Sequence, residues 1–449
     1  MKQQPQTKSD LEILRTALES GTMQQVERMV STLHPAEVAL LLESLPPPER
    51  NIVWGVVNPE DEGEVLVQLN DEVRTRLIEG MPLDELVTAT EGMELDDLAD
   101  VIANLPETIT QQVIRSLSQQ DRERLHDVLA YPEDSAGGLM NPNTVSVRPD
   151  LTLKVVLRYL RMLGEVPDNT DALFVVGRQN RYVGVLLISR LVTQGPGKTV
   201  AEVMDDSVEP IHASTPAAEV AKEFQNRDLI AAAVVDENGR LLGQITVDDV
   251  VDVIREQADH DILSMAGLDE DDDMFAPVVT SARRRAIWLG VNLATAFVAA
   301  AVVGLFKPTL DKVVILAVLM PVVASMGGVA GSQTLTLMIR GLALGRVESS
   351  NARWIFAKEL AVGLLNGLAW AAVVAVVTRL FFDTWAVGAI IAAALAINLL
   401  VAAVAGFAIP LLLRKAKIDP ALAGGVVLTT VTDVVGFVAF LGLGTIYLT

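Results

Sequence analysis

The chain has 449 residues and a formal net charge of −22, yet 51% of its residues are hydrophobic. Residues 1–282 contain 22 Lys or Arg and 51 Asp or Glu, whereas residues 283–449 contain 13 and 6, so an acidic half precedes a basic, very apolar half. This division excludes a single soluble domain, a disordered chain and, because cysteine is absent, a disulfide scaffold; the acidic half also repels phosphate, which argues against nucleic-acid binding.

The first part of the acidic half is expected to be helical. Residues 1–10 are interpreted as a disordered N-terminus, and residues 11–130 as an acidic all-α superhelical domain, because short segments with helical apolar periodicity recur along them. In one segment Asp96 and Asp100 lie four residues apart on one helical face, where like charges repel unless a cation binds between them. A solvated acidic surface explains this pair equally well.

Residues 131–255 are expected to form a tandem α/β repeat, because helix, strand, strand and helix occur twice in succession. The strand-like segments are residues 173–176, 182–188, 232–235 and 241–245. This arrangement resembles a pair of CBS domains. In the second copy, Gly243, Thr246 and Asp249 match the Gly-x-x-Thr-x-x-Asp pattern that holds an adenosine ribose in many CBS domains, so Thr246 and Asp249 are candidates for binding ATP. The first copy lacks the Asp, and a CBS pair indicates regulation without specifying a substrate.

Residues 256–282 are expected to form a connecting, plug-like helix followed by an acidic linker. Carboxylates spaced three and four residues apart form a stripe on this helix and on the segment before it, and one more lies beside the stripe. They are Asp249, Asp252, Glu256, Asp259 and, beside the stripe, Asp261. Because these groups repel one another without counterions, the pattern favours a divalent-cation sensor; the alternative is a solvated acidic linker.

Residues 283–449 are expected to form a transmembrane domain of five helices, because five apolar stretches each supply the roughly 20 residues needed to cross a bilayer. The stretches are residues 287–306, 313–339, 357–377, 385–413 and 424–448. Ten basic residues lie on one side of the spans and three on the other. The more basic side faces the cytoplasm. We therefore expect a multi-pass protein of the cell inner membrane, with cytoplasmic N-terminal domains and an outside C-terminus.

The spans contain one carboxylate near the middle of the bilayer, Asp433, in the segment 429–433 that also holds three threonines. An ionisable residue at this depth is expensive and usually functional, and oxygen ligands suit a hard cation such as hydrated Mg²⁺. Pro321 and the glycine-rich run 327–333 are expected to break or kink the second span and free carbonyls toward a cavity. The alternative for this run is a closely packed helix interface.

The complete order of segments resembles the MgtE family of Mg²⁺ channels and transporters, over nearly all of the chain after the first ten residues. Four motifs carry the resemblance: residues 131–140 (YPEDSAGGLM), 321–333, 339–345 (IRGLALG) and 430–437. The resemblance implies a homodimer in the lipid bilayer whose pore lies at the subunit interface, with Asp433 facing hydrated Mg²⁺. The expected pore-lining residues are Thr429, Thr430, Thr432, Gly328 and Gln333.

The resemblance also implies regulation by cytoplasmic Mg²⁺, with ATP as a possible second regulator. Residues that match the family's regulatory sites by position are Asp96, Asp100, Asp228, Asp249, Asp252 and Asp261, and the stripe adds Glu256 and Asp259. The chain departs from the family pattern at five positions: Val329 replaces a frequent Asn, Gln257 and His260 replace acidic residues, and Pro216 and Ala218 replace expected carboxylates. We therefore expect the sensor to hold fewer ions, or to hold them more weakly.

The sequence thus predicts a Mg²⁺-selective channel or transporter for uptake, which Mg²⁺ binding to the cytoplasmic domains closes. Enzymatic activity is not expected, and the chain has no phosphate-binding G-x-x-x-x-G-K-[ST] loop. Three alternatives remain: a membrane-anchored nucleotide or divalent-cation sensor without transport, a CBS-regulated channel for another divalent cation such as Co²⁺, and a CBS-regulated anion channel. The last needs more spans and a positive pore.

Overall fold

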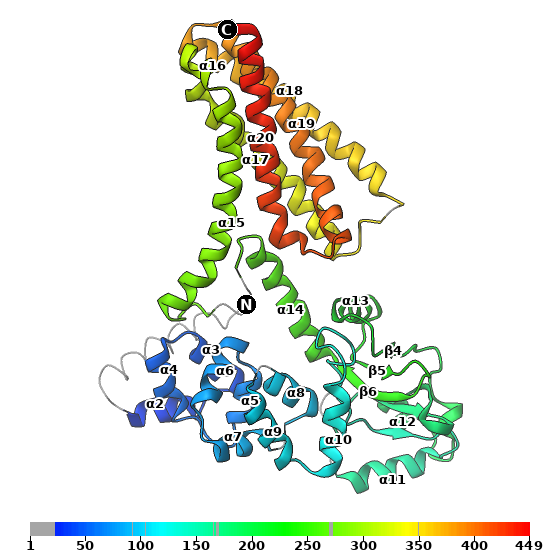
Figure 1. Cartoon of the computed structure of the whole chain (residues 1–449). Helices are drawn as coiled ribbons and strands as arrows, with labels where there is room; N and C mark the ends of the chain where they lie inside the picture. Colours follow the sequence, from blue (N-terminus) through cyan, green and yellow to red (C-terminus); the bar gives the residue numbers. More distant parts are fainter. Residues whose placement is uncertain are drawn as a thin grey trace. The chain divides into compact units, whose positions relative to one another are not determined.

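The computed structural model describes residues 23–91, 93–103, 105–164, 166–167, 170–268, 273–348 and 350–449. The predicted disordered N-terminus, the start of the predicted helical domain up to residue 22, and linker residues 269–272 lie outside the described residues. The chain divides into two compact units (Figure 1). The first comprises Met1–Ala258 with Asp271–Ala276, and the second comprises Asp259–Glu270 with Pro277–Thr449.

The first unit begins with a series of short helices, as the periodicity predicts. They are α2 (Met23–Val30), α3 (Pro35–Glu43), α4 (Pro47–Trp54), α5 (Glu62–Val67), α6 (Asp71–Gly80), α7 (Leu83–Thr90), α8 (Leu95–Ala103), α9 (Glu107–Ser116) and α10 (Gln119–Val128). Side-chain caps define some of their starts: Asn70 accepts a hydrogen bond from the Val73 N–H, and Ser118 accepts one from the Asp121 N–H. Helices this short are marginal alone, so packing must supply most of their stability.

The two α/β repeats each contain a three-stranded sheet. The first sheet has the order β1 (Ser146–Val147), β2 (Ala172–Val176), β3 (Tyr182–Leu187), and the second has β4 (Ile211–His212), β5 (Ala231–Val235), β6 (Leu241–Thr246). In both sheets the first pair is parallel and the second antiparallel. The associated helices are α11 (Leu153–Leu163), α12 (Ile188–Thr193) and α13 (Ala217–Arg227), with short 3₁₀ turns at Arg178–Asn180 and Val200–Glu202. The identical topology confirms the predicted tandem fold.

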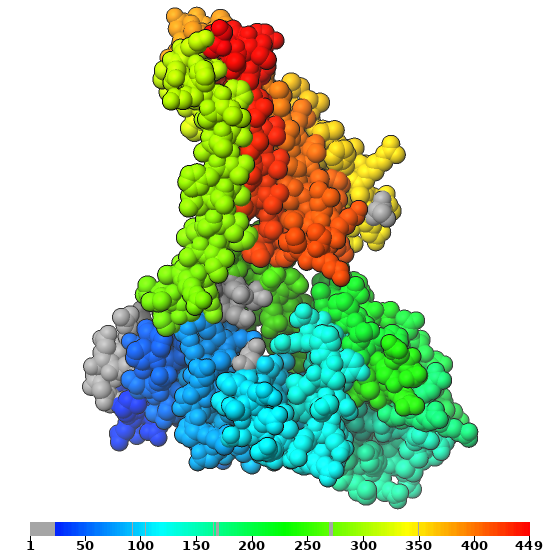
Figure 2. All heavy atoms as spheres, viewed as in Figure 1, coloured from blue at the N-terminus to red at the C-terminus, as the bar shows by residue number. Residues whose placement is uncertain are grey.

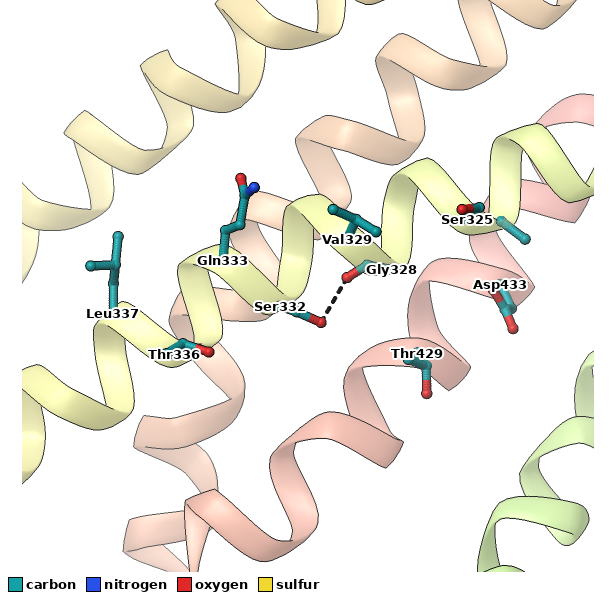
Figure 3. Close-up of a pocket in the computed structure, with 10 residues that line it drawn as sticks. Ser325, Gly328, Val329, Ser332, Gln333, Thr336, Leu337, Thr429 and Asp433 are labelled. Carbon is teal, nitrogen blue, oxygen red and sulfur yellow. Dashed lines mark hydrogen bonds between the residues drawn. The ribbon is translucent and has the colours of Figure 1, made fainter. Parts of the chain in front are cut away.

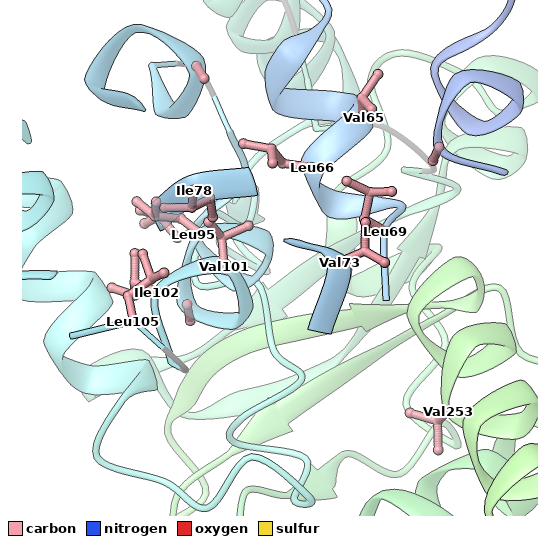
Figure 4. Packing of buried hydrophobic residues seen from close by; sticks show 14 of the residues in the cluster. Val65, Leu66, Leu69, Val73, Ile78, Leu95, Val101, Ile102, Leu105 and Val253 are labelled. Carbon is pink, nitrogen blue, oxygen red and sulfur yellow. The ribbon is translucent and has the colours of Figure 1, made fainter. Parts of the chain in front are cut away.

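One hydrophobic core joins the helical domain to the second α/β repeat. It includes Leu66, Ile78 and Ile102 of the helical domain together with Val253 of α14 (Val247–Ser264), all buried (Figure 4). A shared core of this kind resists separation, because pulling the two apart would expose apolar area to water. Acidic residues of α8 and of the first turns of α14 are thereby held in one compact unit.

The second unit contains five helices long and apolar enough to cross a membrane, which confirms the predicted five-helix domain. They are α15 (Val278–Leu305), α17 (Ile315–Ala343), α18 (Ala352–Phe382), α19 (Trp385–Lys415) and α20 (Pro420–Leu448), with the short α16 (Lys307–Lys312) between the first two. Helix α19 packs against α17, α18 and α20, whereas α15 contacts mainly α20. Almost all of α15 is exposed within the single chain, and its side chains form a column along one side of the membrane helices (Figure 2).

Of the predicted break or kink in the second span, the break is wrong, because α17 continues through Pro321 and the glycine run as one helix. Two of its glycines face other helices at very short range. A Cβ atom on Gly327 would lie 2.2 Å from Asn398 Nδ2, and one on Gly331 would lie 2.9 Å from Leu428 Cδ1. Gly328 has open space beside it. The run is therefore a close-packed interface on one side of the helix, which is typical of small residues in membranes.

Candidate ion pathway and acidic regulatory face

Helices α17 and α20 line an open groove of about 1070 Å³ (Figure 3). Its lining residues are Ala324, Ser325, Gly328, Val329, Ser332, Gln333, Thr336 and Leu337 of α17, and Thr429 and Asp433 of α20. Successive polar or small positions on α17 are three or four residues apart, which places them on one helical face. Thr429 and Asp433 are four apart on α20 and point into the same space.

The hydroxyl groups in the groove are oriented to accept hydrogen bonds from a ligand. Ser332 Oγ donates its proton to Gly328 O at 2.8 Å (Figure 3). Thr429 Oγ1 lies 3.1 Å from both Gly425 O and Val426 O. Because each hydroxyl proton is directed to a carbonyl of its own helix, the oxygen lone pairs remain available on the groove side. Together with the Asp433 carboxylate, these acceptors suit a cation that keeps its water shell.

The predicted pore residues divide into two groups. Gly328, Gln333 and Thr429 line the groove beside Asp433, and so does Val329, the departure from the family pattern. Thr430 and Thr432 are not among the lining residues. The Thr430 hydroxyl donates to Val426 O at 2.7 Å, and the fully buried Thr432 hydroxyl contacts Leu428 O and Thr429 O at 3.1 Å. Their side chains therefore satisfy helix carbonyls away from the groove.

Sequence reasoning missed three hydroxyl-bearing lining residues and one buried polar side chain, Glu359. Ser325, Ser332 and Thr336 line the groove, and their spacing of three or four residues from Gly328 is the signal that could have identified them. Glu359 of α18 is 6% exposed and accepts a hydrogen bond from Thr334 Oγ1 at 3.1 Å. Its other oxygen, Oε1, lies 3.1 Å from Lys358 Nζ. Asn398 of α19, a weaker polar signal in the fourth span, is fully buried.

In the first unit, acidic residues of α8 face the start of α14. Asp96 is 7% exposed, and within the described part of the chain its Oδ1 has no hydrogen-bond partner. Burial is the main cause that raises the pKa of Asp96 to about 9, and the nearby Asp249 carboxylate contributes to this increase. Burial is also the main cause that raises the pKa of Asp249 and of Asp97, to about 7 and about 6. Ionising this face without a counterion is therefore unfavourable, and a bound cation would relieve the cost.

An arginine already supplies part of the positive charge at this face. Arg74 of α6 donates to Asp71 Oδ1 at 2.7 Å and to Leu69 O at 3.0 Å. Desolvation raises the pKa of Asp100, although its side chain is exposed, and Arg74 opposes that increase. Arg74 has the same opposing effect on Asp97. This internal cation and a metal ion would compete for the same carboxylates.

The remaining predicted regulatory residues are dispersed. Asp252 and Glu256 are exposed on α14, and desolvation raises the pKa of Asp252. Asp228 ends α13 in a left-handed conformation with φ of 51° and is exposed. Asp259 and Asp261 belong to the second unit. Among the residues that the structure describes, no group of three Asp, Glu or His side chains is close enough to hold a metal ion.

The predicted ribose-binding pair is engaged in capping α14. Asp249 Oδ2 accepts hydrogen bonds from the Thr246 N–H at 3.0 Å and from Thr246 Oγ1 at 3.1 Å, and Thr246 Oγ1 also contacts Asp248. A carboxylate that caps the first turn is favourably placed at the positive end of the helix. A ribose hydroxyl would have to share or replace these contacts.

Among the departures from the family pattern, His260 has a defined contact. Its Nε2 lies 3.3 Å from Asp419 Oδ2 in the second unit. Asp419 also caps α20, because its carboxylate accepts hydrogen bonds from the Ala421 and Leu422 N–H groups at 2.9 and 3.2 Å. An imidazole therefore contacts a carboxylate at a position where the resemblance implies an acidic residue. Pro216 is the N-cap residue that precedes α13, and the exposed Gln257 lies on α14.

These features define a multi-pass membrane protein in which a helical domain and tandem CBS domains precede five apolar helices. Family models agree with each part: "MgtE intracellular N domain" matches residues 33–134, "CBS domain" matches 136–195 and 200–256, and "Divalent cation transporter" matches 320–443. The chain belongs to the MgtE family of magnesium transporters, which confirms the resemblance drawn from the sequence motifs.

Two magnesium transporters are similar to this chain over nearly their whole length. The magnesium transporter MgtE of Thermus thermophilus is 31% identical over 441 residues, which cover 97% of this chain and 98% of that protein. The magnesium transporter MgtE of Bacillus subtilis is 26% identical, with 96% of each chain covered. A crystal structure of the cytosolic domain of the Mg²⁺ channel MgtE in complex with ATP is 32% identical, covers 54% of this chain and 99% of that one, and has a TM-score of 0.49.

Proposed function

We propose that this chain carries Mg²⁺ into the cell across the inner membrane along the groove between α17 and α20. The observation that carries the proposal is the position of Asp433, which faces a groove lined by small and hydroxyl-bearing side chains. Mg²⁺ loses water reluctantly, so a pathway for it needs acceptors for a hydrated ion rather than a tight cage of carboxylates. One carboxylate among hydroxyl oxygens fits this requirement.

A second copy of the chain completes the pathway in this proposal. Among the residues that the structure describes in one chain, those that line the groove belong to α17 and α20. A symmetric homodimer would bring two Asp433 carboxylates to opposite sides of one ion, and isologous interfaces are the commonest arrangement in homodimers. In this assembly the N-terminal domains lie in the cytoplasm and the C-terminus lies outside, as the distribution of basic residues favours.

Cytoplasmic Mg²⁺ closes the pathway by neutralising the acidic faces. The raised pKa values of Asp96, Asp97 and Asp249 support this step, because burial first, and then the neighbouring carboxylates, make the ionised form of each group unfavourable there. The other proposed regulatory ligands are Asp100, Asp228, Asp252, Glu256, Asp259 and Asp261. ATP, held by Thr246 and Asp249, is the proposed second regulator.

Flux measurements on the full chain in liposomes test the pathway. Asp433→Ala should abolish Mg²⁺ uptake, whereas the matched variant Asp383→Ala, which removes an exposed carboxylate at the end of α18, should transport normally. Uptake by Asp433→Ala at the wild-type rate would refute the pathway. Competition by Co²⁺ in the same assay decides whether Mg²⁺ is preferred, and absence of flux in the wild type would favour a sensor without transport.

Protease sensitivity tests the gating. Millimolar Mg²⁺ should protect α14 of the full chain from cleavage, and Asp96→Asn combined with Asp249→Asn should remove that protection. The matched control is Asp236→Asn, which changes a partly exposed carboxylate in the turn between β5 and β6. Identical cleavage of the wild type with and without Mg²⁺ would contradict regulation by this face.

A further inference from the structure

Asn398 lies near the middle of α19 and is fully buried where that helix packs against α17 and α20. Its Nδ2 donates a hydrogen bond to the backbone oxygen of Val323 in α17 at 2.9 Å. The amide therefore connects the side chain of one membrane helix to the backbone of another. Hydrogen bonds of this kind help to hold helices together where surrounding lipid offers no polar partner.

Glycines on both neighbouring helices make room for this amide. A Cβ atom on Gly327 of α17 would lie 2.2 Å from Asn398 Nδ2, and a Cβ atom on Gly436 of α20 would lie 2.8 Å from the same nitrogen. Real Cβ atoms do not approach other atoms so closely, so neither position accepts even alanine without a shift of Asn398 or of a helix. The three residues form one interlocking contact among α17, α19 and α20.

This contact lies directly behind the wall of the groove. Gly327 immediately precedes Gly328, which faces the groove, and Gly436 follows Asp433 by three residues, less than one helical turn. A sliding movement of α17 against α20 at Asn398 would therefore move the hydroxyl-bearing face of α17 relative to Asp433 by a similar amount. The width and register of the groove depend on this contact.

Packing alone does not require a polar residue at this position. Within the described residues, the Asn398 Oδ1 atom is buried and accepts no hydrogen bond. A buried acceptor without a partner is unfavourable, and an apolar side chain of equal size would avoid the cost. The amide is therefore explained by its directed hydrogen bond to Val323 rather than by its volume.

We propose that Asn398 is a positioning residue of the ion pathway, which fixes the register of α17 against α20 and thereby the spacing between Asp433 and the opposite wall. The inference rests on the proposed function, because it assumes that ions pass along this groove. Asn398 does not touch the ion. It acts through the two helices that do, so it determines how well the hydrated ion fits.

Substitutions of similar shape separate positioning from packing. Asn398→Leu keeps the branched shape in a somewhat larger side chain and removes the hydrogen bond, and Thr378→Val makes a similar change at a buried polar residue of α18 that does not line the groove. In liposome flux assays, Asn398→Leu should change the ratio of Mg²⁺ to Co²⁺ flux, or the half-saturating Mg²⁺ concentration, about fivefold, the factor that one net hydrogen bond contributes. Thr378→Val should leave both quantities unchanged.

A double-mutant cycle provides the second readout. Gly327→Ala should impair the flux ratio because its methyl group collides with Asn398. In the Asn398→Ala background the same substitution should add almost nothing, because the colliding amide is gone. Additive effects in this cycle would overturn the inference, and so would an Asn398→Leu protein with wild-type flux ratio and half-saturation. If Asn398→Leu does not fold, the double-mutant cycle alone tests whether Asn398 positions the two helices.

Asp433→Ala, measured in parallel, separates the two claims. Loss of flux in Asp433→Ala together with an unaffected Asn398→Leu protein overturns only the role of Asn398. Wild-type flux in Asp433→Ala overturns the groove as the pathway, and the inference about Asn398 falls with it.

Discussion

A buried ion pair fastens the segment that precedes the first membrane helix to the helical domain. Arg50 of α4 and Asp273 each have a side chain that is 2% exposed, and the guanidinium contacts both carboxylate oxygens, at 3.0 and 3.3 Å. The same guanidinium donates to Leu42 O at 2.9 Å and to Leu45 O at 3.1 Å. The Asp273 N–H in turn donates to Glu72 Oε2 at 2.9 Å. Each of the three guanidinium nitrogens of Arg50 therefore donates a hydrogen bond within one unit.

Replacing Arg50 with methionine should release this segment. The substitution keeps an unbranched chain but leaves Asp273 buried, with Arg76 at 3.4 Å as its remaining guanidinium, and removes the donor from two buried carbonyls. Breaking a buried pair by removing one partner costs about 3–5 kcal/mol, and the residual contact with Arg76 places the expected cost near the lower value, about 3 kcal/mol. Local opening of the segment should then increase about a hundredfold.

Hydrogen exchange of the full chain in detergent measures this opening. The Asp273 and Phe275 amides, which donate to Glu72 Oε2 and to Asp273 Oδ1, should exchange faster in Arg50→Met, whereas amides of β2 should be unaffected. Arg76→Met is the matched control, because its guanidinium is 27% exposed and makes the longer contact, so its effect should be clearly smaller. Unchanged exchange at both amides in Arg50→Met would refute the reasoning.

Three further results are expected. Asn70→Ala removes the cap of α6 and should cost about 1 kcal/mol of stability, seen as a lower melting temperature that Asn70→Ser restores; equal melting of both variants would contradict it. Glu359→Leu should lower the melting temperature of the membrane domain more than Glu359→Gln, since glutamine still accepts the Thr334 proton, and the reverse order would disprove this role. The folded pKa values of Asp96 and Asp249, about 9 and about 7, exceed the ordinary value of 3.8, so these groups favour folding below pH 4 and that contribution is lost as pH rises through 7 to 9. Without Mg²⁺ the protein should therefore melt at a lower temperature at pH 9 than at pH 6, and the opposite trend would refute the pKa assignments.

Hydropathy and repetition were sufficient to predict the architecture, because long apolar stretches and a duplicated strand pattern are local properties of the sequence. Residues 11–130 were predicted to be helical, but α4, which begins at Pro47, was not identified as a separate helix. Pro47 and Pro48 lie in its first turn, where a missing N–H has no intrahelical partner to lose and the fixed φ already suits a helix. The two-residue strands β1 and β4 are too short to produce a pattern, and only pairing in the fold defines them.

The candidate site was only partly accessible from the sequence. The position of Asp433 among hydroxyl-bearing residues is local, but the roles of the glycines on α17 are not. Gly327 packs against Asn398, whereas Gly328, one residue further on, faces the groove. Which glycine packs and which faces the groove depends on α19, a helix some 70 residues away in the chain. The local spacing of residues in α17 does not show where that helix lies. In the same way, the effect of Asp249 on Asp96 depends on a contact between two domains.

The central position of α19 has a consequence for how the protein is made. In the single chain α19 is the most buried of the five long helices, and it also has the highest mean hydropathy among them. Contact with lipid in the finished protein therefore does not explain its apolar character, since neighbouring helices cover much of it. Membrane helices enter the bilayer largely on their own apolarity, before such neighbours can shield them. The apolar composition of α19 is thus explained by the need to insert into the bilayer. Its one fully buried amide, Asn398, has to enter lipid before it can form its hydrogen bond with the Val323 carbonyl.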